Sequence, residues 1–582
     1  MSAPVLNVAA SVLGNCWAWR GGVAPDPAGG DDLVAQLFRA RGAPSEDFDR
    51  LRSAKLRDWL PDPSVFRDMD AAAGRIARAI MTGEPVVVFG DYDVDGATSA
   101  ALMIRTIRDC GGAATAYIPD RLLEGYGPSA TAMTALAARG ATLIVTVDCG
   151  TQGFEALGAA RDANVDVIVV DHHQASTALP PALAVVNPRR LDEAGGAAFG
   201  HLAAVGVAFL LAVAVVRDLR RAGWFAARPE PRLLDRLDLV ALGTVADVVP
   251  LTGLNRAFVA QGLKVMAARR TAGLAALAGV AGIERAPTCH DLGFALGPRI
   301  NAGGRIGKAD LGVRLLTTDD PDEARSLAAE LDLLNTERRA IEAAVAAEAL
   351  ALVPRTDNAA VALVASGGWH PGIIGIVAGR LKEKLGRPAI VIALEGEVGK
   401  GSGRSVPGVD LGSAVLAAKD AGLLIAGGGH AMAAGLTVAA DRIDALAAFL
   451  EDRLGGDFDR APPLLTLDAA VTPRGVCVDL ADALETAGPY GQGWPQPRIA
   501  SGPWRVAACD VVGEHHVRAI LMGQDGARLK AMAFRAADTP LGTALAGAVG
   551  RWCVVAGRVR RDEWGRTPAA ELHLDDLAWV DA

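Results

Sequence analysis

The sequence predicts an α/β protein with a parallel-sheet domain, a long bridging helix, a second α/β domain and a C-terminal β-barrel. Three observations predict this architecture. Apolar runs typical of strands alternate with Ala-rich helical stretches from residue 86 to residue 170, one helical pattern fills 321–353, and short alternating segments follow residue 460. A chain of 582 residues is also too long for a single hydrophobic core.

The first domain is expected at 76–320, after a partly helical N-terminal region, 1–75, with loops rich in Pro, Gly and Asp. Its strands are predicted at 86–89, 115–118, 143–147 and 166–170, with a helix at 97–110. Continuous apolar strands that alternate with helices indicate a parallel sheet covered on both faces. Residues 200–270 are predicted to be mostly helical. Their apolar run, 202–216, is too short to cross a bilayer and is typical of a buried helix.

The bridging helix, 321–353, begins at a proline and is followed by Pro354. Apolar side chains recur along it at a spacing of three to four: Leu327, Leu331, Leu334, Ile341 and Val345. Its middle, NTERR, is polar, so we expect the helix to join two domains. The second α/β domain, 354–460, has predicted strands at 361–366 and 389–394 and a helix at 372–386. Segments such as 552–559 and 570–577 predict a small β domain in 461–582.

Composition narrows the class of protein. The net charge of −9 disfavours a general polyanion binder, although it allows a local basic groove. Seven cysteines without a CxxC pair favour reduced thiols. The N-terminal segment lacks the basic start of a signal peptide. We therefore expect a cytoplasmic protein that is not inserted in a membrane.

The stretch DYDVDG, 91–96, looks like the start of a calcium-binding EF-hand loop. An EF-hand loop closes with a bidentate Glu at its twelfth position, which here is Leu102, and it follows a helix, whereas VVVF reads as a strand. The calcium interpretation fails on both points. The three carboxylates must have partners elsewhere in the chain.

Two later strands end in the same way. LIVTV is followed by Asp148, DVIVV is followed by Asp171, His172 and His173, and LGTVADVVPL supplies Asp247. The carboxyl ends of parallel strands meet at one edge of the sheet, where functional groups gather. A single Asp after a strand is usually a helix cap, but so many carboxylates at one edge need cations to stay ionised. Carboxylates with imidazoles suit two Mn²⁺ or Mg²⁺ ions, about 3.5–4 Å apart, as in phosphate-ester hydrolysis.

The ordered motifs resemble a known family. DYDVDG, VDCG, DHH and GTVADVVPL resemble the DHH phosphoesterases. GPRINAGGRIGKAD, WHPGIIGIVAGRL, GKGSGRSVPGVDL and GGGHAMAAGLTV are similar to segments of the RecJ family, single-strand-specific 5′→3′ DNA exonucleases within that superfamily. The resemblance covers nearly the whole chain, and it implies a DHH domain, a DHH-associated domain and an oligonucleotide-binding (OB) barrel.

The resemblance implies specific metal ligands. Asp93 would bind the first ion and Asp95 the second, Asp148 would bridge both, and His172 and Asp247 would complete the second. Asp171 would orient the neighbouring histidine, and His173 would reach the scissile phosphate or the leaving oxygen. Many DHH enzymes carry a histidine four residues before the first metal-binding aspartate, where this chain has Phe89. We therefore expect the first site to be the weaker one, Phe89 to be packed in the core, and Phe89→His to lower the Mn²⁺ needed for activity if the site accepts the ring.

The resemblance also implies a path for DNA. From the first domain, the phosphates would be reached by Arg121, Arg299, Asn301 and Arg305. From the second domain, they would be reached by Ser402, Arg404 and His430, which lie in glycine-rich segments that allow close backbone approach. The alternative is that these segments are only tight turns. Stacking would fall to the rings Tyr490, Trp494, Trp504 and Trp564. Trp494 stands where the family usually has Asn, so the contact at that turn is open.

Together these features predict a two-metal exonuclease that degrades single-stranded DNA to 5′-mononucleotides in repair and recombination. Two alternatives stay open: a non-catalytic nucleic-acid-binding module and a DHH phosphodiesterase for short oligonucleotides. The chain keeps its acidic and histidine ligands and carries the late β domain, which both favour the exonuclease. We expect a monomer, with a single-strand-binding protein and a repair helicase as candidate partners.

Overall fold

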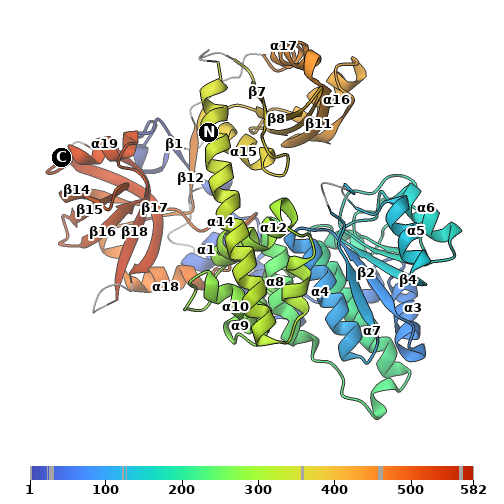
Figure 1. Ribbon diagram of the computed structural model, residues 1–582. Coiled ribbons are helices and arrows are strands. Elements are labelled where there is room, and N and C mark those ends of the chain that lie inside the picture. The colour runs from blue at the N-terminus through green and yellow to red at the C-terminus, as the bar shows by residue number, and fades with distance from the viewer. Residues whose placement is uncertain are drawn as a thin grey trace.

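The computed structural model describes residues 3–22, 24, 32–120, 124–125, 127–354, 359–455, 463–562 and 568–580. Three compact units lie around the long helix α14 (Pro321–Leu352): the first domain is beside its lower part, the second domain is beside its upper part, and the barrel is on the left (Figure 1). Within these ranges no helix is both long and apolar enough to cross a membrane.

The first domain contains a five-stranded parallel sheet in the order β3-β2-β4-β5-β6. The strands are β2 (Val86–Gly90), β3 (Ala114–Tyr117), β4 (Leu143–Val147), β5 (Asp166–Val170) and β6 (Ala184–Val186). The four expected strands are confirmed, and β6 was not predicted because it has only three residues. One face packs on α4 (Val94–Asp109), α3 (Met69–Thr82) and α7 (Ala204–Arg221), and the other on α5 (Ala130–Ala138) and α6 (Phe154–Asp162).

The apolar run 202–216 lies mostly in α7, as expected of a buried helix, and almost all its side chains are buried. Helices α8 (Leu237–Ala246), α9 (Gly253–Ala267), α10 (Ala272–Val280), α12 (Gly297–Ile306) and α13 (Leu311–Thr317) complete this domain. A single turn of π-helix, Leu292–Leu296, leads directly into α12.

Helix α14 packs on α10, α12 and α13 of the first domain and on α15 (Ile374–Leu385) of the second, which confirms that it bridges two domains. Two details differ from the expected pattern. Ile341 is exposed, and the polar middle is partly internal, because Arg338 and Glu342 are buried 2.6 Å apart. Arg380 of α15 also contacts Glu342, at 2.5 Å. This ion network joins α14 to the second domain.

The second domain has a five-stranded sheet in the order β10-β11-β9-β8-β7. The strands are β7 (Ala362–Gly367), β8 (Ala389–Glu395), β9 (Val398–Arg404), β10 (Ala426–His430) and β11 (Ala433–Ala439), with α15, α16 (Leu411–Asp420) and α17 (Ile443–Leu454) packed around them. The expected 361–366 and 389–394 strands are confirmed.

The glycine-rich segments form strands β9 and β10, so the alternative that they are only tight turns was wrong. The reason is packing. A Cβ at Gly399, Gly401 or Gly403 would lie 2.6–2.7 Å from side-chain atoms of Ile392, Leu436 and Leu411. Glycine alone lets β9 lie this close to its apolar neighbours.

The C-terminal unit is a closed barrel, as predicted. Strands β14 (Ile499–Val512), β15 (His516–Gly523), β16 (Arg528–Ala533), β18 (Ala569–Trp579) and β17 (Trp552–Asp562) follow one another, and β17 pairs back to β14. Helix α19 (Pro540–Ala546) lies between β16 and β17. Strand β1 (Cys16–Trp19) pairs with β12 (Leu464–Leu467), so the N-terminal region is tied to the segment that precedes the barrel, a pairing that local sequence patterns cannot reveal.

Candidate metal centre and substrate cleft

The DYDVDG stretch turns the end of β2 into the start of α4. Asp93 is the N-cap of α4, and its Oδ1 accepts a hydrogen bond from the Gly96 amide at 3.0 Å. A Cβ on Gly96 would lie 2.4 Å from the backbone oxygen of Asp91. The glycine therefore allows the first turn of α4 to lie against Asp91, which keeps the aspartates of this motif together.

Asp148 follows β4 with a left-handed backbone, φ +58°. A non-glycine residue in this region carries strain that is typical of functional sites. Two residues later Gly150 also has positive φ, and a Cβ there would lie 2.6 Å from Thr146 Oγ1. The tight turn after β4 thus places the Asp148 carboxylate at the sheet edge beside β5.

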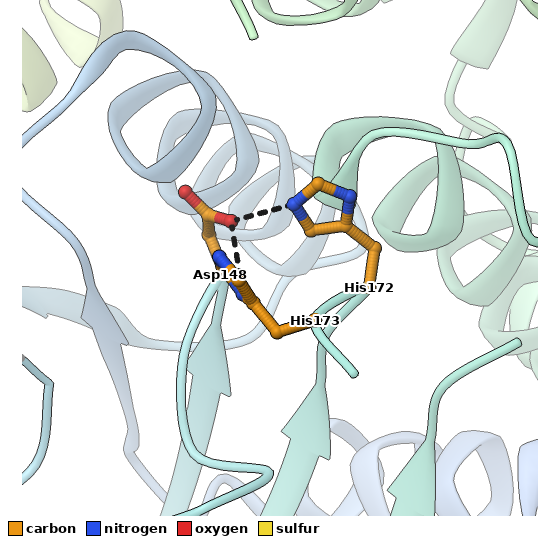
Figure 2. Close-up of side chains that lie close together, drawn as sticks. All are labelled: Asp148, His172 and His173. Carbon is orange, nitrogen blue, oxygen red and sulfur yellow. Dashed lines mark ion pairs between the residues drawn. The ribbon is translucent and has the colours of Figure 1, made fainter. Parts of the chain in front are cut away.

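His172 faces a cluster of carboxylates. Its Nε2 lies 3.4 Å from Asp148 Oδ1, 3.7 Å from Asp247 Oδ2 and 4.0 Å from Asp95 Oδ2. Its Nδ1 lies 3.1 Å from the Leu202 carbonyl, which fixes the ring with Nε2 toward the acids. Figure 2 shows that one oxygen of Asp148 faces both histidines; His173 Nδ1 lies 3.9 Å from it.

Three overlapping groups in the described ranges could each hold a cation: Asp91, Asp93 and Asp148; Asp95, His172 and Asp247; Asp148, His172 and His173. Asp148 belongs to two of them. His172 Nε2 and Asp247 Oδ2 are buried and have no hydrogen-bond partner among the described residues. Buried polar atoms normally have a partner, so this donor set fits a divalent cation bound by oxygen and imidazole ligands.

The electrostatics of the cluster favour bound cations. Burial, and then the charges of neighbouring aspartates, raise the pKa of Asp95 and Asp148 well above the ordinary value. Burial, together with the charge of Asp93, raises the pKa of Asp247 to about 7. Burial lowers the pKa of His172 to about 4, which keeps its ring neutral. Divalent cations would offset the repulsion that raises the carboxylate pKa values.

Asp95 has a second structural function. Its two oxygens accept hydrogen bonds from the Ala204 and Val205 amides, at 2.7 and 2.9 Å, at the start of α7. The carboxylate therefore caps α7 and faces His172 at the same time. Asp91, at the end of β2, was expected at this edge only as a possible contributor to the first site, because strand alternation does not determine its direction; it lies in one cation group with Asp93 and Asp148.

Asp171 Oδ1 lies 2.7 Å from His173 Nδ1. The Asp171 carboxylate also accepts hydrogen bonds from the backbone amides of His172, His173 and Thr151. Burial alone would lower the pKa of His173, but the hydrogen bond and charge of Asp171 raise it to about 9. Burial would raise the pKa of Asp171, yet its contacts with His173 lower it. The histidine that Asp171 orients is thus His173, while Leu202 fixes His172.

Helix α12 lies directly over the DYDVDG motif. A Cβ on Gly304 would meet the Tyr92 side chain at 2.7 Å. One residue on, Arg305 Nη1 donates to the Gly372 carbonyl of the second domain at 2.9 Å. In α15, a Cβ on Gly375 would lie 3.0 Å from Ser402 Oγ and 3.2 Å from Arg404 Nη2. Ser402 and Arg404 therefore lie next to the start of α15, close to the loop at Gly372 that contacts α12.

The other residues expected to bind DNA differ in their hydrogen bonds and in their exposure to solvent. Arg299 donates to Asp332 and to the Ala295 carbonyl, at 2.8 and 2.7 Å. Asn301 has a buried Oδ1 without a hydrogen-bond partner among the described residues. His430 is exposed at the end of β10, where its Nδ1 accepts from the Met432 amide. Arg121 lies outside the described residues.

The rings expected to stack on bases are mostly internal. Trp504 is fully buried and donates to Ser501, and Trp494 is buried, donates to the Ala487 carbonyl and packs on Phe38. Tyr490 is partly buried with its hydroxyl bonded to the Leu484 carbonyl, and Trp564 lies outside the described residues. The assignment of Trp494 and Trp504 to stacking was wrong, because the barrel and its linker use these large rings as core.

Phe89 is fully buried, as expected for core packing, and stacks on Tyr117 with ring centroids 5.2 Å apart. It belongs to the apolar cluster under α5 and α6. Cys149 is likewise buried, and all seven cysteines are free thiols.

Comparison with known proteins agrees with this architecture. Residues 85–244 match the DHH family, N-terminal domain, residues 356–456 the DHHA1 domain, and residues 467–576 the RecJ OB domain. The single-stranded-DNA-specific exonuclease RecJ of Dickeya dadantii is 40% identical over 84% of this chain and 86% of its own length. Crystal structures of Thermus thermophilus RecJ with Mn²⁺ and with Mg²⁺ superpose with TM-scores of 0.77 and 0.71, at 29% identity, over 94% of this chain and 76% and 75% of theirs.

Proposed function

Because the chain belongs to the RecJ family of single-stranded-DNA-specific exonucleases, we propose that it degrades single-stranded DNA in the 5′→3′ direction with divalent cations, releasing 5′-mononucleotides. The observation that carries this proposal is the set of overlapping carboxylate and imidazole groups at one sheet edge, with Asp148 shared between groups. Such an arrangement suits the hydrolysis of a phosphodiester.

Dependence on divalent metal follows from the family and the ligand set. We assign Asp93 to a first ion, Asp95, His172 and Asp247 to a second, and Asp148 to both, with Asp91 as a further ligand of the first. When bound, the cations would offset the charge of the phosphate and lower the pKa of a water, so that the water loses a proton and attacks phosphorus while the bond from phosphorus to the leaving 3′ oxygen breaks.

The residues around the metal ligands orient them and contact the substrate. The Leu202 carbonyl holds His172 with Nε2 toward the acids, and the strained turn at Asp148 aims its carboxylate at the shared position. Asp171 holds His173 at the rim, where the ring can donate a hydrogen bond to the scissile phosphate or the leaving oxygen. Asp91, Asp95, Asp148 and His172 are buried, which shields these side chains from bulk solvent.

Substrate binding is assigned to residues of both the first and the second domain. Ser402, Arg404 and His430 would hold the terminal phosphate, and Arg299, Asn301 and Arg305 would contact the strand on the first domain. The support is that α12 contacts the metal motif and the second domain at once, through Gly304 and Arg305. Arg121 would join this set from outside the described residues. The barrel would hold the single strand upstream.

The two alternative functions explain the structure less well. A non-catalytic binding module needs no buried imidazole nitrogen aimed at three carboxylates. A phosphodiesterase for short oligonucleotides needs no closed OB barrel after the DHH-associated domain.

As a nuclease for single-stranded DNA, the protein would act in the cytoplasm, in repair and recombination. We propose that it works as a monomer and is recruited by a single-strand-binding protein and a repair helicase.

One assay tests the function. The purified protein is incubated with Mn²⁺ and end-labelled single-stranded DNA, duplex DNA or RNA of equal length, with EDTA as the control. We expect mononucleotides from single-stranded DNA with a free 5′ end, and no release in EDTA. Binding of single strands without hydrolysis under any divalent cation would contradict the exonuclease and favour the binding module.

A further inference from the structure

Few aromatic rings are available to nucleic-acid bases on this protein. Among the Phe, Trp and Tyr side chains in the described ranges, only Phe154, Phe294 and Phe534 are exposed. Phe294 is the most exposed of the large apolar side chains described, at 74%. Since Trp494 and Trp504 are internal, bases must find their stacking partners elsewhere.

Phe294 lies on a second ring rather than alone. Its ring stacks on the imidazole of His290, with centroids 4.7 Å apart and planes inclined by 27°. His290 is also exposed. The two residues are four apart along the turn that enters the π-helix Leu292–Leu296, a type of helix that often occurs at functional sites. Together they form a short aromatic stack, which we name the His290–Phe294 platform.

The platform is rigidly held. Leu292 and Leu296, on either side of Phe294, are fully buried. Arg299 connects the Ala295 carbonyl to Asp332 of α14. The backbone that carries the exposed ring is therefore anchored to the first domain and to the bridging helix.

The platform lies beside the metal centre. A Cβ on Gly293 would lie 3.6 Å from Val245, and one on Gly297 would lie 3.5 Å from Ala246. These two residues are at the end of α8, immediately before the candidate metal ligand Asp247. The π-helix thus packs against the turn that presents Asp247.

The turn beside the platform is also connected to the barrel. The Leu251 amide, four residues after Asp247, donates to the Gln492 carbonyl at 2.8 Å. Arg256 donates to the carbonyls of Ala487 and Pro489 in the same connection to the barrel. The end of α8 and the turn after it therefore contact the π-helix through Val245 and Ala246 and the segment that leads to the OB barrel through Leu251.

From these contacts we propose that the His290–Phe294 platform stacks on a base of the single strand between the barrel and the metal centre. This inference rests on the proposed function, because it needs a strand that passes from one to the other. A ring face accepts any base, so the platform would bind without sequence preference, and a duplex, whose bases are already stacked, could not use it.

The test uses fluorescence of 2-aminopurine placed at successive positions of a single strand, with the full-length protein in EDTA so that the strand stays intact. We expect the wild type to quench one or two neighbouring positions near the 5′ end. Phe294→Ala should lose this quenching and bind the strand about tenfold more weakly, within the range for one base–aromatic stack. Phe294→Trp should keep both properties.

Phe534→Ala is the matched control, because it removes another exposed phenylalanine, on the barrel. It should leave the quenching pattern near the 5′ end unchanged whatever it does to overall affinity. A strand with abasic sites at the quenched positions should bind wild type and Phe294→Ala equally well.

The outcomes separate the two proposals. If the wild type neither binds nor degrades single-stranded DNA, the proposed function fails. If it does both, while a Phe294→Ala variant with unchanged thermal unfolding binds within twofold and quenches alike, only the platform is overturned. An equal loss of affinity by Phe294→Ala on normal and abasic strands would also overturn it.

Discussion

Replacement of the shared carboxylate, Asp148→Asn, tests the metal centre through two independent quantities. The change keeps the side-chain shape and removes one negative charge from a buried site that also contains Asp93 and Asp95. In the metal-free protein these like charges repel one another at close range, so the wild type carries an electrostatic cost. Removal of one charge should therefore stabilise the metal-free fold.

The magnitudes follow from the arrangement. A gain on the order of 1 kcal/mol in EDTA would raise the melting temperature by roughly 2–4 °C for a folding unit of 150–250 residues. Each cation at a concentration a hundred times its Kd should stabilise the wild type by about 2.7 kcal/mol, or roughly 5–10 °C per bound ion. Because Asp148 belongs to two of the three possible cation groups, Asp148→Asn should lose most of this metal-dependent shift. Its rate should fall more than hundredfold, beyond the usual effect of changing a residue that only orients a ligand.

The assay is thermal unfolding in EDTA and in Mn²⁺, combined with exonuclease rates on end-labelled single-stranded DNA. Asp238→Asn is the control, since Asp238 is equally buried but bonded to Thr271 and the Leu239 amide, away from the described cation groups. It should leave the Mn²⁺ shift unchanged. An Asp148→Asn variant that keeps the full Mn²⁺ shift and more than a few per cent of the rate would refute the shared position of Asp148.

Three further changes test other parts of the site. Arg404→Ala should weaken binding of 5′-phosphorylated strands about tenfold more than 5′-hydroxyl strands, since a charge-assisted hydrogen bond contributes roughly 1.5–3 kcal/mol; equal losses in a filter-binding assay would make Arg404 a general backbone contact. Phe89→His places an imidazole in a fully buried apolar cluster, so we expect it to destabilise the fold by about 1–3 kcal/mol. The Mn²⁺ concentration for half-maximal rate should stay unchanged, and a lower value would show that the ring reaches the first ion. Gly96→Ala should force the first turn of α4 away from Asp91, which should lower the free energy of unfolding in denaturant by about 1–3 kcal/mol and reduce the exonuclease rate. Gly158→Ala, at an open helical position in α6, is the control and should be neutral or stabilising. Similar behaviour of the two variants would contradict the packing argument.

The sequence by itself determined the elements whose signal is local. Strands β2, β4 and β5 are short apolar runs that end in acidic residues, and α14 repeats its apolar positions at helical spacing between two prolines. Parallel strands must present their carboxyl ends at one edge, so the gathering of Asp148, His172 and the DYDVDG aspartates could be inferred before any coordinate. Periodicity and strand direction carry that information within a few residues.

Only the tertiary structure decided which distant groups meet. Glycines hide the alternation of β9 and β10, because a strand with no side chain on its packed face gives no hydrophobic pattern. The same local sequence was compatible with exposed or internal tryptophans, and packing of Phe38 against Trp494 settled that choice. Asp171 could have oriented either neighbouring histidine, and the Leu202 carbonyl, thirty residues later, takes His172 and leaves His173 to Asp171. Contacts between residues far apart in sequence depend on how the layers pack, and no local pattern encodes that.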